Sequence, residues 1–262
     1  MMLTEVVVMR SSRKVRWSGV PIDSLEHRSR SVKLLLMATP KRSPRRSDAL
    51  SRDRIVEAAI ELLDTQGESD LTFRALTTRL STGAGAIYYH VASKNELLAV
   101  ATDEVIGEVM AQIPSDMEPE STIRAISLGI FDAIGAHPWV GAQLSQNPQP
   151  AVLRIWKAVG LQLQSLGLDG SALSDAGSAL VSYVLGSAAQ YAVGARRLPN
   201  DADRKAYLEA LAVQLTEQDA DPLVDEIADQ LREHDDRDQF LAGVNIFLTG
   251  ITQLSSGAVP PT

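Results

Sequence analysis

The chain has 262 residues, a formal net charge of −8 and no cysteine. The lack of cysteine excludes disulfides and thiolate metal sites, and no apolar run approaches the roughly 20 residues that a membrane-spanning helix needs. We therefore expect a cytoplasmic protein with no membrane partner. The charge is uneven, because residues 1–54 carry a net +8 and residues 55–262 a net −16. A basic segment beside an acidic body favours a polyanionic partner, although a solvated basic tail would have the same composition.

The first 47 residues are rich in serine and arginine and lack helical periodicity, which predicts a disordered basic extension over 1–47. The run MATPKRSPRR, which begins at Met37, resembles a natural start, so we expect residues 1–36 not to be translated. In either case residues 41–46 form a short basic arm.

Apolar residues then recur at helical spacing and predict three short helices in succession. The first begins after Ser51 and ends at Gly67, the second follows Thr72, and the third lies between Gly83 and Val91. Helices of about 16, 9 and 8 residues joined by tight turns have the layout of a helix-turn-helix unit, whose second helix enters the major groove of DNA.

The third helix opens on small residues, which would let its backbone approach DNA closely. Ile87 is expected to face inward, against Leu62 and Leu76. The run SKNE, residues 93–96, is a capping box that begins a fourth, longer helix. Tyr88, Tyr89 and His90 lie near the end of the third helix, where their hydroxyl and imidazole groups can reach phosphates. The alternative for Tyr88 and His90, and for Tyr88 above all, is that they pack the junction between helices.

The segment LTFRALTTRLSTGAGAIYYHVASKNELL resembles the DNA-binding domain of the tetracycline-repressor (TetR) family of bacterial transcriptional regulators. The resemblance covers about residues 51–105 and is carried by the capping Thr72, Leu76, Leu80, residues 87–91, Ser93, Lys94 and residues 96–98. It implies a DNA-binding domain over 48–110. It also implies phosphate contacts by Thr72, Tyr89, His90 and Lys94, and base contacts by Arg74, Ala84, Gly85 and Ala86.

The turn before the third helix departs from the family pattern, because Ser81-Thr82-Gly83 stands where Gly-Val-Ser is usual. Residues 84–86 include no arginine, asparagine or glutamine that could form paired hydrogen bonds with a base. Base preference is therefore expected to depend on Ala86 against a thymine methyl, on Thr82, on Arg74 or on the basic arm.

From residue 115 the chain reads as helix after helix, separated by the breakers AHP, NPQP, GLDG, RRLPN and DADP, with no strand alternation. We therefore predict an all-α fold with an N-terminal three-helix DNA-binding domain and a larger C-terminal helical domain over 115–254. A disordered tail is expected over 255–262. The stretch 219–238 is acidic and predicts a solvated pair of helices.

The resemblance implies that the C-terminal domain binds a small ligand and forms a homodimer. Sparse aromatic and polar-tipped residues suit a pocket of mixed character, with ordinary core packing as the alternative: Phe131, His137, Trp139, Trp156, Tyr183 and Tyr191. Asp132 and His137 could hold a metal-chelate ligand, but the four histidines of the chain show no paired spacing. We expect no metal and no cofactor.

Two segments have the composition of subunit contacts. Residues 171–195 are rich in alanine, glycine and serine, and the last long helix carries an apolar stripe of Phe240, Val244, Phe247, Leu248 and Ile251. Two helices from each subunit would form a four-helix bundle, and a two-fold dimer demands a near-palindromic operator. Burial of the stripe within one chain is the alternative.

An enzyme is not expected. The run GAGA at Gly83 lacks the third glycine of a nucleotide loop and follows a helix, and no HExxH, GxSxG or GxxxxGK[ST] motif occurs. The sequence predicts a ligand-responsive repressor that binds an operator as a homodimer and is released by an unknown small molecule. The alternatives are an activator of the same fold and a helical protein-interaction module that does not bind DNA.

Overall fold

The computed structural model describes residues 50–146, 149–198 and 200–255, and every regular element among them is an α-helix. This confirms the predicted all-α fold class. The extension predicted over 1–47, with its basic arm, lies outside the described residues. The tail predicted over 255–262 also lies outside them, except for Ser255, which ends the last helix.

The first four helices are α1 Arg52–Gln66, α2 Phe73–Leu80, α3 Ala84–His90 and α4 Lys94–Ala111. Side-chain oxygens of Ser51, Thr72 and Ser93 cap α1, α2 and α4, and each such cap contributes about 1 kcal/mol. The capping box differs from the expected form, because the Glu96 carboxylate accepts a hydrogen bond from the amide of Ala92 at 2.8 Å. Gly83 is the N-cap residue of α3 and provides no side-chain cap.

The remaining helices of the described ranges are α5 Pro119–Ala136, α6 Pro138–Leu144, α7 Pro150–Ser165, α8 Gly170–Arg197, α9 Asp201–Gln218, α10 Pro222–Arg232 and α11 Asp236–Ser255. Four of them begin with a proline, which has no amide hydrogen to leave unpaired in the first turn. The breakers AHP, NPQP and DADP therefore predicted where α6, α7 and α10 begin.

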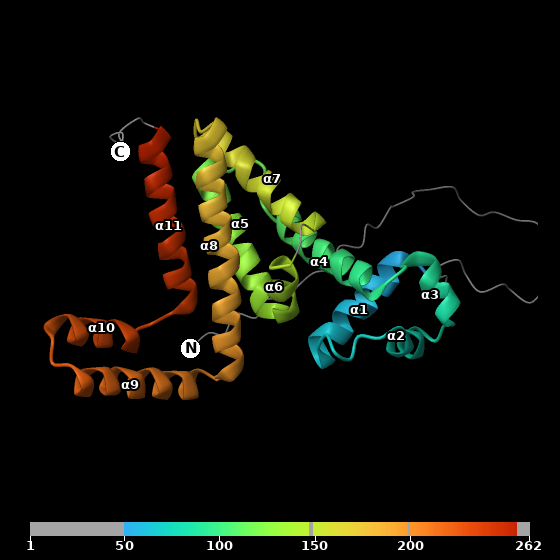
Figure 1. Ribbon diagram of the computed structural model, residues 1–262, viewed down its shortest axis with the longest axis horizontal. Coiled ribbons are helices and arrows are strands. Elements are labelled where there is room, and N and C mark those ends of the chain that lie inside the picture. The colour runs from blue at the N-terminus through green and yellow to red at the C-terminus, as the bar shows by residue number, and fades with distance from the viewer. Residues whose placement is uncertain (1–49, 147–148, 199, 256–262) are drawn as a thin grey trace, which may run out of the picture. The chain divides into compact units, whose positions relative to one another are not determined.

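Helix packing places α4 and α8 at the centre of the arrangement (Figure 1). α4 contacts α1 on one side and α5, α6 and α7 on the other. α8 runs beside α5 and α11, whereas α9 and α10 form a hairpin whose main contacts are with each other. Because α4 belongs to both groups of helices, the boundary between domains at 110–115 stays a prediction.

The apolar stripe of α11 faces the inside of the chain. Phe240, Val244, Leu248 and Ile251 are buried against the core, and Phe247 is half-buried. The prediction that this stripe forms the dimer interface is therefore wrong for the four buried side chains, which have no surface left to offer a second subunit. The outward face of α11 carries Ile246, which is 73% exposed.

Tyr183 of α8 sets the separation between α8 and α11. Its hydroxyl donates to the carbonyl oxygen of Phe240 at 3.0 Å, and a methyl group at Gly243 would overlap its ring and hydroxyl. We expect Gly243→Ala to lower the free energy of unfolding by about 1–3 kcal/mol, measured by urea denaturation. Gly250→Ala on the same helix, where an added Cβ would meet nothing within 4 Å, should cause no loss. An equal loss in both variants would contradict this account.

Candidate nucleic-acid interface and cavity

α3 is held in place by one fully buried side chain. Ile87 belongs to the same buried cluster as Leu62 of α1 and Leu76 of α2, which confirms its predicted inward direction. Burying such a side chain contributes roughly 1.5–3 kcal/mol. A helix of seven residues is too short to be stable alone, so its packing against α2 and the core determines where the outer face of α3 lies.

The outer face of α3 begins with small residues. Ala84, Gly85 and Ala86 are all exposed, and Thr82 in the preceding turn is half-buried. None of the side chains at 84–86 can form paired hydrogen bonds with a base. The tip of α3 is therefore a surface of backbone and methyl groups.

Two tyrosines and a histidine end α3, and their surroundings differ. Tyr89 is 86% exposed and meets the ring of half-buried His90 edge-on, with 5.2 Å between ring centroids. Tyr88 packs on Phe73 of α2 with 4.4 Å between centroids and stays half-exposed. Tyr88 thus supports the junction of α2 and α3, and Tyr89 presents its hydroxyl to solvent.

The arginines near α3 differ in how they are paired. Arg79 forms an ion pair with Glu61, and Arg52 forms one with Glu96. Arg74 is exposed on α2, and its side chain makes no hydrogen bond or ion pair with any described residue. The Arg74 guanidinium is therefore available to an external partner.

Two residues with predicted phosphate contacts also hold the fold together. The Thr72 hydroxyl accepts a hydrogen bond from the amide of Ala75 at 3.1 Å. Lys94 Nζ donates to the carbonyl oxygen of Glu68 at 2.6 Å and so ties the start of α4 to the turn after α1. Lys94 is half-buried, so any phosphate contact would come in addition to this bond.

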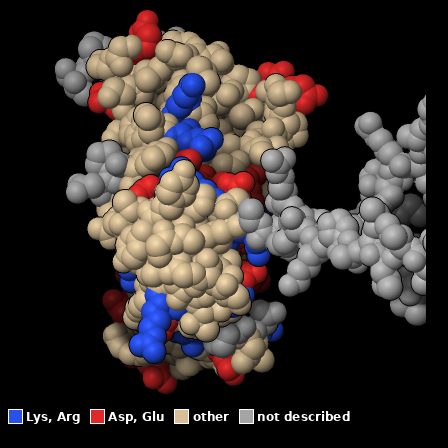
Figure 2. Space-filling view, turned by 90° about the vertical axis from the view of Figure 1, so that its right-hand side faces the viewer, with Lys and Arg blue, Asp and Glu red and all other residues tan. Residues whose placement is uncertain are grey.

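Figure 2 shows the side of the protein that lies at the right of Figure 1, where α1, α2 and α3 are found. On this face the lysine and arginine side chains are interspersed with acidic ones around a broad uncharged area. The described residues of this face therefore offer separate cationic points to a polyanion.

The last turn of α1 is joined to α6 by side-chain hydrogen bonds. Asp64 Oδ1 lies 2.8 Å from His137 Nδ1 and accepts a hydrogen bond from Trp139 Nε1 at 2.7 Å. Buried Gln143 donates from Nε2 to Glu68 Oε2 at 3.1 Å. These bonds, which we call the Asp64 junction, connect α1 with α6. α1 precedes α2 and α3, whose exposed residues, together with the turn between them, we call the reading surface.

The Asp64 junction corrects part of the predicted ligand pocket. Trp139 is only 7% exposed and donates its indole N–H to Asp64, so it is a junction residue and lies outside the cavity of about 690 Å³ that is described next. His137 uses Nδ1 on the same carboxylate and borders a separate hollow of about 490 Å³ beside α4 and α5.

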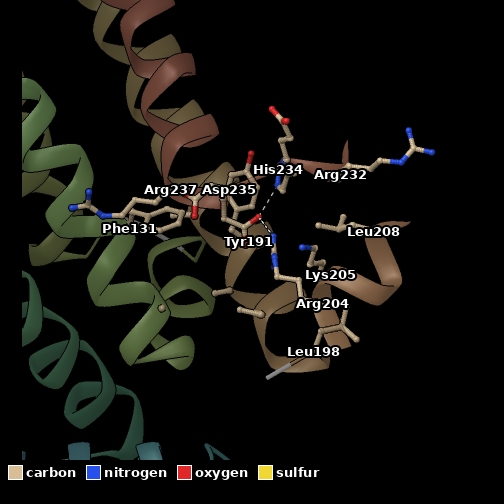
Figure 3. Close-up of a pocket in the computed structure, with 16 residues that line it drawn as sticks. Phe131, Tyr191, Leu198, Arg204, Lys205, Leu208, Arg232, His234, Asp235 and Arg237 are labelled. Carbon is tan, nitrogen blue, oxygen red and sulfur yellow. Dashed lines mark hydrogen bonds and ion pairs between the residues drawn. The ribbon is translucent and has the colours of Figure 1, made fainter. Parts of the chain in front are cut away.

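A cavity of about 690 Å³ is lined by α5, α8, the start of α9 and the turn between α10 and α11 (Figure 3). The predicted pocket residues Phe131 and Tyr191 both line it, with their rings edge to face at 5.8 Å between centroids. Burial raises the pKa of the Tyr191 phenol, so this hydroxyl stays protonated at neutral pH. Ala188, Ala192 and Gly135 leave room beside the two rings.

Charged groups line the other side of the cavity, and sequence analysis missed them. Arg204 forms an ion pair with Asp236, and His234 Nε2 lies 2.8 Å from Asp236 Oδ1 (Figure 3). Lys205 also lines the cavity, whereas the Arg232 side chain extends away to Glu209. The sequence placed His234 and Asp236 in a solvated acidic stretch, and no local signal links them to Arg204.

The other two predicted pocket residues lie between helices. Trp156 of α7 packs so closely on α8 that a Cβ at Gly177 would come within 2.9 Å of its ring. Tyr183 packs against α11 as described above. Neither residue lines the 690 Å³ cavity, so a ligand-binding role for Trp156 and Tyr183 stays a prediction.

Within residues 50–146, 149–198 and 200–255, no three acidic or histidine side chains are grouped so that they could hold a metal ion. The pair considered for a metal-chelate ligand has separate partners, since Asp132 meets Arg237 at 3.4 Å and His137 meets Asp64. The helices of the same ranges include none with the length and apolar character needed to cross a membrane.

Comparison with known proteins matches this chain to transcriptional regulators. Residues 55–101 match the sequence model of the bacterial regulatory proteins of the tetR family. The chain is 33% identical over 184 residues to an HTH-type transcriptional regulator of Saccharopolyspora erythraea, which spans 70% of this chain and 76% of the relative.

Two solved structures share the fold. The transcriptional regulator SCO7222, a TetR from Streptomyces coelicolor, has a TM-score of 0.72 and 44% identity, covering 79% of this chain and 100% of that chain. The TetR family protein ActR of Streptomyces coelicolor, in complex with actinorhodin, has a TM-score of 0.64 and 23% identity, covering 79% and 99%. At that identity the second likeness concerns the fold alone.

Removal of the Asp64 carboxylate should weaken the junction. Asp64→Ala leaves the nearly buried indole N–H of Trp139 without its acceptor, and we expect the free energy of unfolding to fall by about 1–3 kcal/mol in urea denaturation. Glu57→Ala, at an exposed position of the same helix, is the control and should change little. Unchanged stability in Asp64→Ala would mean that these bonds do not hold α1 to α6.

Proposed function

Because this chain belongs to the TetR family of bacterial transcriptional regulators, we propose that it represses transcription as a homodimer and leaves its operator when a small molecule binds. Membership makes it a DNA-binding protein, with α2 and α3 as its helix-turn-helix. The observation that carries the finer proposal is the Asp64 junction, which joins α1 to the end of α5, where the wall of the cavity lies. A ligand-responsive repressor needs a reading surface, a ligand site and a connection between them.

In this proposal α3 enters the major groove with its exposed tip toward the bases. Arg74, which has no partner among the described residues, reaches the bases from α2. The base-facing residues are then Arg74, Thr82, Ala84, Gly85 and Ala86, and the phosphate-contacting residues are Thr72, Tyr89, His90 and Lys94.

The dimer forms through the outward faces of α8 and α11. Ile246 of α11 is 73% exposed, and Leu254 of α11 and Val193 of α8 are exposed as well. α8 and α11 pack side by side, so the same pair from a second copy would complete a four-helix bundle (Figure 1). Two-fold symmetry then places two copies of α3 on a near-palindromic operator.

The effector binds in the 690 Å³ cavity, where a flat apolar part can lie beside Phe131 and Tyr191 while polar groups meet the charged side. ActR, which shares the fold, is solved with actinorhodin bound. This supports a small-molecule site in this chain.

Release follows from the order of residues in α5. Phe131 and Gly135 line the cavity, α5 ends at Ala136, and His137 then meets Asp64 of α1. An effector that displaces the end of α5 therefore shifts α1 and the α3 surface. A differential affinity of about 10-fold to 100-fold, roughly 1–3 kcal/mol of coupling, is enough for such a response.

The DNA-reading role is tested by selecting bound fragments from the intergenic DNA of the host. The wild-type protein should retain near-palindromic duplexes with an affinity that falls as salt rises. Arg74→Ala should lose about 1–3 kcal/mol at the selected site and discriminate less between sequences. Lys157→Ala, an exposed lysine of α7, is the control. Intact selectivity in Arg74→Ala would remove Arg74 from the base-facing residues, and a wild type that binds no duplex would end the DNA-reading proposal.

The dimer proposal is tested at Ile246. Ile246→Asp places a charge in the centre of the proposed interface, so sedimentation velocity should show monomers and operator affinity should fall. Leu153→Asp changes an equally apolar residue that is 70% exposed on α7, and it should remain dimeric. A dimer that survives Ile246→Asp would place the interface elsewhere.

A further inference from the structure

Two kinds of surface meet in the cavity of about 690 Å³, and their chemistry restricts what can occupy it. On one side the rings of Phe131 and Tyr191 lie edge to face, and Ala188 and Gly135, which have little or no side chain, lie beside them. Space next to exposed ring faces suits a flat ring system that can stack there. The apolar part of an occupant is therefore aromatic.

Hydrogen-bond donors predominate on the charged side of the cavity. Arg204 and His234 share one carboxylate, because both contact Asp236 Oδ1. One N–H of the Arg204 guanidinium is bonded to it, and the remaining donors have no acceptor among the described residues. The Tyr191 phenol adds an O–H, since burial raises its pKa and keeps it protonated. These groups can all donate to an occupant.

Lys205 adds a cation that the described chain does not neutralise. It lines the cavity beside Arg204 on α9, and its exposed side chain makes no hydrogen bond or ion pair with any described residue (Figure 3). The other basic side chains of the lining are engaged elsewhere, Arg232 with Glu209 and Arg237 with Asp132. Lys205 is thus free to meet a ligand.

The acidic side chains of the lining offer less than these donors need. Asp236 is occupied as described, and Asp235 accepts a hydrogen bond from the amide of Asp238 in the first turn of α11. Glu233 is the one acidic side chain of the lining without a partner among the described residues. Its carboxylate has fewer acceptor positions than the arginine, lysine and tyrosine have donors. The free hydrogen-bonding capacity of the cavity therefore suits an acceptor-rich, negatively charged group.

We propose that the effector is an aromatic carboxylate, with its ring system beside Phe131 and Tyr191 and its acid group on Arg204 and Lys205. A carboxylate can accept two N–H groups of one guanidinium at once. Asp236 is the first residue of α11, so an acid group that takes over Arg204 frees the start of α11 from α9. The inference rests on the proposed function and names the chemical class of its effector.

Isothermal titration calorimetry tests this class with probes that share one ring system: 2-naphthoate, the neutral 2-naphthamide and the cationic 2-naphthylmethylammonium. The full-length protein should bind 2-naphthoate at least about tenfold more tightly than either of the others. Lys205→Met should weaken the binding of 2-naphthoate roughly tenfold and leave that of 2-naphthamide unchanged. Lys157→Met, at an exposed lysine of α7 outside the cavity, is the matched control and should change neither.

Asp236→Asn supplies a test of opposite sign. It removes the negative charge that Arg204 is paired with, so 2-naphthoate should bind several-fold more tightly, even if the thermal midpoint of the protein falls. A residue with a merely structural role would not tighten the binding of the acid alone. Weaker or unchanged binding of 2-naphthoate would remove Arg204 from the acid site and overturn the inference.

Three further results would overturn it. Equal or tighter binding of 2-naphthamide or 2-naphthylmethylammonium would show that the cavity does not select an acid. Unchanged binding of 2-naphthoate by Lys205→Met would place the acid group elsewhere. Absence of binding by all of the probes would exclude the class.

A release assay separates this inference from the proposed function. The selected duplex, bound to wild-type protein, is followed by fluorescence anisotropy as each probe is added. Release by 2-naphthamide or 2-naphthylmethylammonium would overturn the acid class and leave ligand-driven release intact. If 2-naphthoate bound as inferred and the duplex stayed bound, the acid site would stand and ligand-driven release would fail.

Discussion

The reading surface depends on the burial of one side chain, Ile87. α3 has seven residues, which is too few for a stable isolated helix, and Ile87 is its one fully buried side chain among the described residues. The position of every exposed group on α3 therefore follows from the burial of this side chain. Since the inward face fixes the helix, the outward face is free to carry small residues that contribute nothing to packing.

α1 takes part in both the buried core and the Asp64 junction, through different residues. Leu62 belongs to the buried cluster around Ile87, and Asp64 binds His137 and Trp139. α1 contacts α6 and α2, and α2 in turn contacts α3. A displacement of α6 would therefore act first on α1, and α2 links α1 to α3.

The helices could be predicted from the sequence because their start signals are local. Ser51, Thr72 and Ser93 each cap a helix with an oxygen that lies within three residues of the amide it binds. Local sequence does not specify which part of the protein covers the apolar face of a helix. Residues 240, 244, 248 and 251 have the same spacing whether a second subunit or α8 covers them, and the deciding contact comes from Tyr183, 57 residues away from Phe240. The sequence therefore predicted α11 but assigned its buried face to the wrong partner.

The site residues likewise include some whose role could be predicted from the sequence and some whose role could not. Phe131 and Trp139 look alike in the sequence, as sparse aromatic residues among aliphatic ones, but Asp64 lies 75 residues before Trp139 and takes its only donor. Lys94 likewise donates to Glu68, whereas the side chains of Arg74, Tyr89 and Tyr191 make no hydrogen bond with any described residue. Lys94 shows that a side chain predicted to meet DNA can also hold the fold, so what separates these residues is the use that the chain makes of their hydrogen-bonding groups. That use depends on neighbours brought together by folding, so residue type and spacing alone do not reveal it.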